Sequence, residues 1–371
     1  MNKNTSTDSK KEPGLGKTIK QDIKEGDLFH TVRKDIKSLK DFYIDVEKKK
    51  RLENMGIIER WFHLVWWIMK NMILRLTPAR RILLLVGILF LFTAKFNYST
   101  GHSKDDISID GSGILGGMII LIVLMLELKD KILAKDELYE GRKIQQALMP
   151  IENPDIPGWS VWIFMRSANE VSGDLVDYIN IDSERHGLII ADVSGKGLKA
   201  ALLTTKLQST IRALAADFDL TNLAEKVNQI FHRDSLRNIF ASLLFIELSS
   251  TNGKVKFINA GHLPPVILNS NGFKEMPKGD TALGILKDMK YSENILDFVS
   301  GDALISYTDG IIEARNEKGF FYGNERFFAL LPLLKNKSAE EIGNSILSDV
   351  DKFSGRASAN DDLSMIIIKR N

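Results

Sequence analysis

The chain contains no cysteine among its 371 residues. This absence excludes disulfide bonds, zinc sites built from cysteine and every mechanism that needs a cysteine nucleophile, and it is typical of a reducing compartment. The chain also lacks a strong overall charge, since its formal net charge is +2. That value hides an asymmetry: residues 1–81 carry 19 lysines and arginines against 11 acidic residues, a charge of +8, which leaves −6 for residues 82–371.

Two segments have no charged residue at all. They are residues 82–94 (ILLLVGILFLFTA) and residues 111–126 (GSGILGGMIILIVLML). Each is somewhat shorter than the ~20 residues that span a bilayer, but a charged side chain follows each run and can reach the membrane interface. We therefore predict transmembrane helices at residues 80–98 and 111–128. The alternative is a pair of buried helices in a soluble domain.

Basic residues flank the two predicted membrane helices on the same side. Arg80 and Arg81 precede the first, Lys129 and Lys131 follow the second, and the loop at residues 97–110 has one lysine and three aspartates. Under the positive-inside rule, we expect both termini, and with them the whole segment after the second helix, to face the cytoplasm. We expect a multi-pass protein of the cell membrane whose basic residues meet an anionic lipid surface, and no nucleic-acid partner.

Three further segments lie on the cytoplasmic side. Residues 1–55 are predicted to be a basic leader. Residues 56–77 mix three tryptophans with charged residues, which favours an interfacial amphipathic helix over one packed on a partner. Residues 129–150 alternate charged and apolar residues up to Pro150, which predicts a helical stalk. Its seam is irregular, so a homodimer through the stalk and a solvated linker helix are both open.

Residues 151–371 change to short strand and helix patterns. Asn252-Gly253 and Asn271-Gly272 each separate two strand patterns and predict β-hairpins. The sequence SAEE at residues 338–341 is a capping box that opens a helix. Hairpins with helices clustered between them predict an α/β (α+β) domain of antiparallel sheets flanked by helices.

Aspartates lie at the edges of four apolar runs. They are Asp174 in NEVSGDLVDY, Asp192 in LIIADVSGKG, Asp309 in ISYTDGIIEA, and Asp361 with Asp362 in ANDDLSMIII. Carboxylates brought together from several strand ends repel one another unless a cation lies between them, and Mg²⁺ and Mn²⁺ prefer such oxygen ligands. Glycines beside Asp192 and Asp309 would let a bulky anion approach the backbone. For any one of these aspartates, the alternative is an exposed turn residue.

These segments, with RKIQQALMP, NAGHLPP and YGNERF in the same order, closely resemble the PPM-type (PP2C-like) serine/threonine phosphatases of the SpoIIE/RsbU group. The resemblance covers about residues 142–369. It departs from the usual pattern at Ser172, where glycine is more common. The family is commonly built from two antiparallel β-sheets packed face to face between helical layers. The resemblance therefore implies this sandwich for residues 151–371, after the transmembrane hairpin and the stalk.

The resemblance also implies a site for two ions, Mn²⁺ or Mg²⁺. Asp192 would bridge both ions, and Asp174 and the backbone carbonyl of Val193 would hold one of them. Asp309 and Asp361 would hold the other, so that Asp192 and Asp309 are the catalytic residues we expect. Two such ions orient water for in-line attack on a phosphomonoester. No covalent intermediate is needed, which agrees with the absence of cysteine.

Other residues near these positions are further candidates. Asp362 is the alternative to Asp361, because adjacent carboxylates cannot be separated by sequence alone. Glu170 would orient the site, and Lys196 would either contact a phosphate or point to solvent. His262 in NAGHLPP would be a proton donor or a structural residue, and the rigid Pro-Pro turn after it favours the structural role.

The leading hypothesis is a membrane-anchored, metal-dependent phosphatase that acts on phosphoserine or phosphothreonine of a regulatory protein. By resemblance, that protein is a phosphorylated STAS-type anti-sigma-factor antagonist. A catalytically silent, membrane-bound scaffold that binds phosphoproteins is the main alternative, and it predicts the loss of a metal ligand, although none is missing. A nucleotide cyclase also uses paired aspartates, but the order of segments around Asp192 and Asp309 does not suit it.

Overall fold

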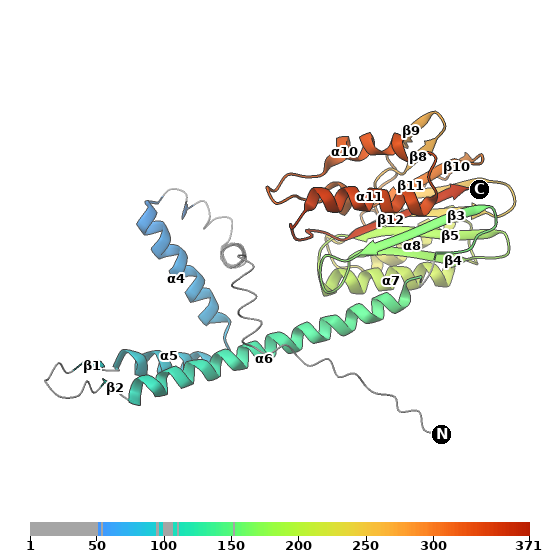
Figure 1. Ribbon diagram of the computed structural model, residues 1–371. Coiled ribbons are helices and arrows are strands. Elements are labelled where there is room, and N and C mark those ends of the chain that lie inside the picture. Colours follow the sequence, from blue (N-terminus) through green and yellow to red (C-terminus); the bar gives the residue numbers. More distant parts are fainter. Residues whose placement is uncertain (1–50, 53–54, 94–95, 99–106, 110, 151–152) are drawn as a thin grey trace, which may run out of the picture. The chain divides into compact units, whose positions relative to one another are not determined.

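The fold is described from a computed structural model, which covers residues 51–52, 55–93, 96–98, 107–109, 111–150 and 153–371. The predicted basic leader at residues 1–55 lies almost entirely outside these residues. The chain divides into two compact units, Met1–Asp130 and Lys131–Asn371. Figure 1 shows the elements of each unit along the chain.

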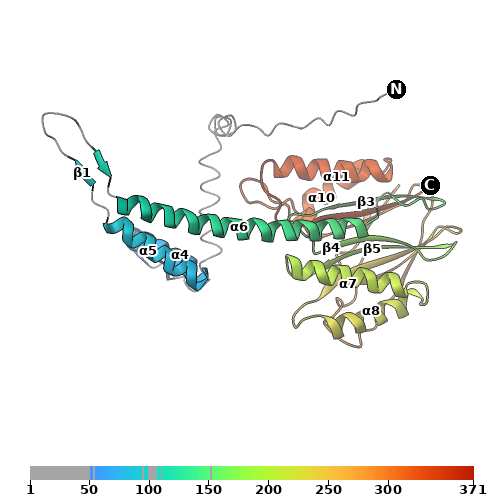
Figure 2. The same ribbon diagram turned by 90° about the horizontal axis from the view of Figure 1, so that it is seen from below.

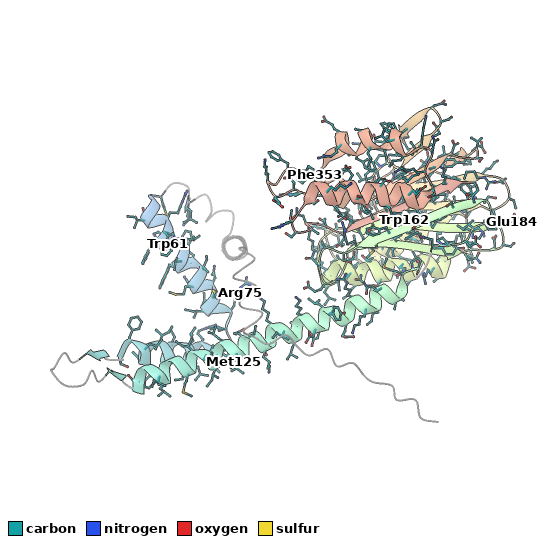
Figure 3. All side chains as sticks on the ribbon, viewed as in Figure 1. Trp61, Arg75, Met125, Trp162, Glu184 and Phe353 are labelled. Atoms are coloured by element: carbon teal, nitrogen blue, oxygen red, sulfur yellow. The ribbon has the colours of Figure 1, made fainter. Side chains whose placement is uncertain are left out.

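The first unit is mainly helical. Its elements are α4 (Ile57–Arg75), α5 (Pro78–Thr93), the two-stranded ribbon of β1 (Phe96–Tyr98) and β2 (Ile107–Ile109), and the first part of α6 (Gly111–Leu148). Helix α4 covers the predicted interfacial segment, and its tryptophans include Trp61, whose side chain is exposed (Figure 3). The long helix α6 contains both the second predicted membrane segment and the predicted stalk, so these two are one continuous helix up to Leu148.

The first predicted membrane helix differs from the structure at its end. We expected a helix over residues 80–98, but α5 ends at Thr93 and Phe96–Tyr98 pairs with Ile107–Ile109 in the ribbon. Antiparallel pairing satisfies the backbone groups of this segment, and the apolar run alone did not signal it. Within the described residues, one helix, Ser112–Leu148, has the length and apolar character to cross a membrane.

Helices α5 and α6 approach each other closely through glycine. A Cβ atom on Gly116 would lie 2.6 Å from the carbonyl oxygen of Gly87, and one on Gly87 would lie 3.2 Å from the Gly116 carbonyl oxygen. At one end of this contact, Arg80 forms ion pairs with Asp130 (2.6 Å) and Glu127 (3.3 Å). Small residues that let two backbones meet are typical of helix pairs in membranes.

The second unit contains two antiparallel five-stranded sheets. The first sheet has the order β10-β7-β6-β5-β4, and the second has the order β3-β12-β11-β8-β9. The strands of the first sheet are β4 (Asp174–Asn180), β5 (Arg185–Val193), β6 (Ala241–Ser249), β7 (Lys254–Ala260) and β10 (Asn294–Asp297). Those of the second are β3 (Trp159–Arg166), β8 (Val266–Asn269), β9 (Gly272–Glu275), β11 (Ala303–Tyr307) and β12 (Leu363–Arg370).

Helices cover the outer face of each sheet, which gives four layers (Figures 1 and 2). Helices α7 (Leu198–Leu214) and α8 (Leu220–Asp234) pack on the first sheet. The second sheet is covered by α10 (Gly323–Leu330), the 3₁₀ turn η1 (Leu331–Leu334) and α11 (Ala339–Ser354), with the short α9 (Asp309–Ile312) after β11. The predicted sandwich of two antiparallel sheets between helices is thereby confirmed.

The apolar run in β5 is continuous because both faces of this strand are buried. Ile189 and Ala191 lie in the core beneath α7 and α8, whereas Leu188 and Ile190 lie in the core between the two sheets. Successive side chains of a strand point to opposite faces, so a strand inside a four-layer sandwich needs apolar residues at every position. The run ends at Asp192, which places this carboxylate at the end of the sandwich.

The turn and capping signals are also confirmed. The two predicted hairpins are β6–β7 and β8–β9, and Ser338 and Glu341 form the predicted capping box of α11. Strands β4 and β10 were not predicted. In β4 the pattern is interrupted by Asp174 and Asp177, which are both buried. Their burial depends on partners that are distant in sequence.

Helix α11 approaches the second sheet at Gly343, next to the ring of Trp162. Trp162 is labelled in Figure 3. A Cβ atom on Gly343 would lie only 2.2 Å from that ring. We expect Gly343→Ala to lower the free energy of unfolding by about 1–3 kcal/mol through overpacking, despite the better helix propensity of alanine. Thermal unfolding measures this loss. Asn344→Ala, at an exposed position of the same helix, is the control, and equal stability of the two variants would contradict the close contact.

Candidate functional site

Two of the predicted aspartates lie directly opposite each other on neighbouring strands. Asp174 is the first residue of β4 and pairs in register with Asp192, near the end of β5. Residues directly opposite in an antiparallel pair point to the same face, and like charges at such positions destabilise the sheet. On the other side of β5, Asp192 pairs with Ser242 of β6. This end of the first sheet therefore presents two close carboxyl groups.

The second sheet brings further aspartates to the same end. Asp309 follows β11 as the first residue of α9, and Asp361 and Asp362 immediately precede the neighbouring strand β12. The two loops meet at Gly310, where an added Cβ atom would lie 1.9 Å from the carbonyl oxygen of Asp362. Only glycine permits this approach. The close approach of the two loops therefore explains why glycine follows Asp309.

Asp174 joins the two sheets. Its Oδ2 atom accepts hydrogen bonds from Thr308 Oγ1 (2.9 Å) and Ser364 Oγ (2.5 Å), which belong to the second sheet and its adjoining turn. The side chain is buried, and this burial raises the pKa of Asp174 well above its usual range. The adjacent carboxylate of Asp192 raises it further, while the two hydroxyl donors oppose the rise.

Asp192 and Asp309 face one cleft, which we call the aspartate cleft. It has a volume of about 400 Å³, and Ser242, His262 and Thr308 are among its other lining residues. Burial raises the pKa of Asp192 to about 7, and the nearby charges of Asp309 and Asp361 add to the rise. Burial followed by the charge of Asp361 also raises the pKa of Asp309. The carboxyl groups are thus close enough to disfavour one another's ionisation.

Asp361 lies at the exposed side of this group. Its Oδ2 atom is 2.7 Å from the ammonium of Lys196, which also donates to the carbonyl oxygen of Asn360 (2.9 Å). Lys196 stands between Gly195 and Gly197, both with positive φ. The side chain of Lys196 therefore points to the aspartates and not simply to solvent. No three acidic or histidine side chains form a compact ligand cluster within the described residues.

Asp362 has a different role from Asp361. Its Oδ1 accepts from the amide of Ala168 (2.7 Å), and its Oδ2 accepts from the Ser172 hydroxyl (2.7 Å) and the Gly173 amide (2.9 Å). These bonds hold the loop that precedes Asp174. Asp362 is buried and both of its carboxylate oxygens accept hydrogen bonds, so it supports the loop. Like Asp174 and Asp361, it is not among the residues that line the aspartate cleft.

The remaining candidates lie around this group. The carbonyl oxygen of Val193 lies beside Gly173, 3.3 Å from the position of an added Cβ atom. Glu170 lies 3.7 Å from Lys135 of α6, in an exposed ion pair. His262 is buried, its Nδ1 lies 3.1 Å from Ser242 Oγ, and burial lowers its pKa to about 4. A neutral imidazole of this kind fits the structural role better than that of a proton donor.

The sequence did not identify Thr308 and Ser364 as site residues. Both are buried, and both donate to Asp174. Ser364 did leave a signal, since it is a polar residue inside the apolar run of the last strand, but only the position of Asp174 explains it. Gln145 was missed as well. Its side-chain amide forms hydrogen bonds with both backbone groups of Ser172, at 3.0 and 3.1 Å, so the end of α6 contacts the loop before Asp174.

Comparisons with known proteins agree with this architecture. The SpoIIE family, described as stage II sporulation protein E, matches residues 182–371. Protein IcfG of Synechocystis is 29% identical over 75% of this chain and 48% of its own length. Phosphoserine phosphatase RsbP of Bacillus subtilis is 26% identical over 49% of this chain and 47% of its own length. The chain thus spans about half the length of these two curated relatives.

A solved structure shows the same fold. The SiaA-PP2C domain of Pseudomonas aeruginosa superposes with a TM-score of 0.57 at 18% identity, and the match covers 66% of this chain and 99% of that domain. At this identity the likeness concerns the fold alone. Since the family match covers just over half of the sequence, including Asp192, Asp309 and Asp361, the chain belongs to the SpoIIE family.

Proposed function

We propose that the chain is a metal-dependent protein serine/threonine phosphatase. The observation that carries the proposal is that Asp174, Asp192, Asp309 and Asp361 come to one end of the sandwich from four loops and strand ends, with too little positive charge among them. They do so although no three of them form a compact ligand cluster within the described residues. Three of these carboxyl groups have raised pKa values. A protein gains nothing in stability from such an arrangement, so it favours a site for cations.

The donor set fits hard divalent ions. It consists of carboxylate oxygens and the Val193 carbonyl, which Mg²⁺ and Mn²⁺ prefer over nitrogen or sulfur ligands. We assign Asp192 to both ions, Asp174 and the Val193 carbonyl to one, and Asp309 and Asp361 to the other. The hydrogen bonds of Asp362 support its exclusion from this set.

When bound, Mg²⁺ or Mn²⁺ would supply the positive charge that activates water and stabilises the phosphoryl oxygens. The residues of the chain orient and hold the reacting groups. Thr308 and Ser364 hold one oxygen of Asp174, which leaves its other oxygen for the site. The ammonium of Lys196 would leave Asp361 and donate instead to an oxygen of the substrate phosphate. Its long side chain is flexible and glycines flank its backbone, so it can reach either acceptor.

The phosphoprotein substrate is proposed from the relatives. RsbP is named a phosphoserine phosphatase, which favours phosphoserine as the group that is hydrolysed. A STAS-type anti-sigma-factor antagonist is the regulatory protein that we propose, in agreement with the resemblance to the SpoIIE/RsbU group. The silent scaffold remains the alternative, but it would not need to preserve all four aspartates and the hydroxyl donors to Asp174.

We also propose that the first unit anchors the chain in the cell membrane. Its support is the apolar stretch within the helix Ser112–Leu148, which is long and apolar enough to cross a membrane, and the close glycine contact between α5 and α6. The apolar side chains of this hairpin are widely exposed, among them Ile82, Leu85, Leu89, Phe92, Met118, Leu121 and Met125. Lipid would cover them. Helix α5 alone has 16 residues, so it would cross a membrane only with its flanking residues.

The activity is tested with the full chain in lipid nanodiscs. We expect hydrolysis of p-nitrophenyl phosphate and of a phosphoserine peptide with Mn²⁺, and none with EDTA. Asp192→Asn and Asp309→Asn should each lower kcat/KM by about a thousandfold, because each removes a carboxylate that would hold the cations whose positive charge stabilises the transition state. Asp297→Asn, at an exposed position of β10, is the matched control. Peptide binding without any turnover would support the scaffold instead.

Variants of the adjacent residues Asp361 and Asp362 distinguish a role in metal binding from a role in folding. Asp361→Asn should weaken Mn²⁺ binding at least about tenfold and leave the melting temperature in EDTA unchanged, since its partner is an exposed lysine. Asp362→Asn should instead lower the free energy of unfolding by about 2–4 kcal/mol, because buried donors lose their acceptor. Calorimetric titration and thermal unfolding measure the two effects. If the two variants exchanged these properties, Asp362 would be the ligand.

The raised pKa of Asp192 predicts a pH dependence of the metal-free protein. Its pKa is about 7 in the folded state and about 3.9 in an unfolded chain. The folded state therefore holds the extra proton between these values, and stability in EDTA should fall as the pH rises from about 4 to 7. Each ~1 kcal/mol lost would lower the melting temperature by roughly 2–4 °C.

The difference between the wild type and Asp192→Asn isolates this effect, because the neutral amide cannot ionise. We expect the variant to be the more stable protein at pH 7.5 in EDTA, and Mn²⁺ to stabilise only the wild type strongly. Melting curves from pH 4.5 to 7.5 measure both. A wild type whose stability relative to the variant does not change with pH would contradict the raised pKa of Asp192, whose main cause is burial and whose second cause is repulsion from Asp309 and Asp361.

A further inference from the structure

A second cleft adjoins the aspartate cleft. It has a volume of about 590 Å³ and is lined by the loop between α8 and β6 and by the segment after Leu283. Two of its apolar side chains are exposed to solvent: Leu236 is 57% exposed and Ile285 is 50% exposed. Phe240, which is 44% exposed, lines both clefts. The two clefts therefore share one aromatic side chain as their common border.

The backbone of Phe240 is hydrogen-bonded to Ser194, at the start of the loop that follows Asp192 and strand β5. The amide of Ser194 donates to the Phe240 carbonyl oxygen (2.9 Å), and the amide of Phe240 donates to Ser194 Oγ (3.0 Å). Ser194 is only two residues after Asp192. Any chain that reaches Asp192 and Asp309 through the aspartate cleft from this side must pass over Phe240.

The second cleft is held rigidly by buried polar groups. Asn228, which is fully buried in α8, donates to the carbonyl oxygens of Leu286 and Lys287 and accepts from the Gly284 amide. His232 Nδ1 lies 2.8 Å from the Gly284 carbonyl oxygen. A surface that is already ordered loses little conformational entropy when a ligand binds. Exposed apolar side chains on an ordered surface are stronger evidence for a binding site than exposed apolar side chains on a mobile loop.

A positive charge also lines the aspartate cleft. Lys278 is exposed, and no carboxylate of the described part of the chain lies within 4 Å of its ammonium. The backbone at the next residue, Gly279, lies close to Asn259, because an added Cβ atom there would lie 2.2 Å from the Asn259 carbonyl oxygen. Lys196, by contrast, already has Asp361 as its partner. Lys278 is thus available to an acidic group of a ligand.

We propose that the substrate segment next to the phosphoserine lies across Phe240, from the aspartate cleft into the second cleft, and that an acidic residue of this segment pairs with Lys278. This inference rests on the proposed phosphatase function. The occupant is an extended phosphopeptide with an acidic residue beside the phosphoserine and an apolar residue further along, which contacts Leu236 and Ile285. The apolar contacts contribute affinity, and the charge pair contributes selectivity.

The test uses the full chain in lipid nanodiscs with Mn²⁺ and three substrates. Two are synthetic phosphoserine peptides that share an apolar residue and differ only in having Glu or Lys beside the phosphoserine. The third is p-nitrophenyl phosphate, which is too small to reach the second cleft. We expect the wild type to prefer the Glu peptide. Lys278→Glu should lower kcat/KM for the Glu peptide about tenfold relative to p-nitrophenyl phosphate and should raise it for the Lys peptide.

The apolar part has its own variant. Phe240→Ala should raise KM for both peptides about fivefold relative to p-nitrophenyl phosphate, with kcat little changed. Lys274→Glu and Phe320→Ala change an exposed lysine and an exposed phenylalanine that line neither cleft, and they should leave all three substrates unaffected.

Two results would overturn this inference and leave the proposed phosphatase function intact. One is an unchanged peptide preference in Lys278→Glu, and the other is an equal loss with p-nitrophenyl phosphate, which would assign Lys278 to the phosphoryl group itself. A wild type that hydrolyses none of the three substrates would overturn the proposed function and this inference together. The small substrate therefore separates the two failures.

Discussion

One buried carboxylate joins the two halves of the sandwich. Asp174 begins a strand of the first sheet, yet its Oδ2 atom accepts hydrogen bonds from Thr308 and Ser364, which lie at the end of the second sheet. The core between the two sheets is apolar and has no directional preference. Two further sets of hydrogen bonds link the sheets or their adjoining loops: Trp159 donates to the Ser249 carbonyl oxygen, and Asp362 accepts from Ser172 and Gly173. The hydrogen bonds to Asp174 therefore set how the ends of the strands meet, and the position of every other aspartate at this end depends on that alignment.

The same alignment creates an electrostatic conflict that the fold itself does not resolve. Gly310 lets the loop of Asp309 approach the backbone of Asp362, and Asp362 in turn holds the loop before Asp174. These contacts are strong enough to keep carboxyl groups together in spite of their repulsion and burial, as their raised pKa values indicate. Stability is lost where these carboxyl groups gather, and it is on this gathering of oxygen donors that the proposed cation site rests.

Much of the fold follows from local patterns. The hairpins, the capping box and the buried strand β5 depend on turn residues, caps and alternating burial, which are all visible along the sequence. Strand β4 was missed because its buried Asp177 is explained only by Arg212 of α7, whose guanidinium donates to it at 2.6 and 2.7 Å. Asp361 and Asp362 look equivalent in sequence for the same reason: hydrogen bonds from Ala168, Ser172 and Gly173 distinguish them, and those partners lie about 190 residues away.

The end of α6 contacts this network at two points. Gln145 holds both backbone groups of Ser172, and the hydroxyl of Ser172 donates to Asp362 while accepting from the Asp174 amide. Gln208 and Arg212 of α7 donate to the carbonyl oxygen of Leu148, the last residue of α6. A change in the orientation of this last turn would therefore act on Ser172 and on Arg212 together. Both residues support β4, so hydrogen bonds couple the end of the helix to the position of Asp174.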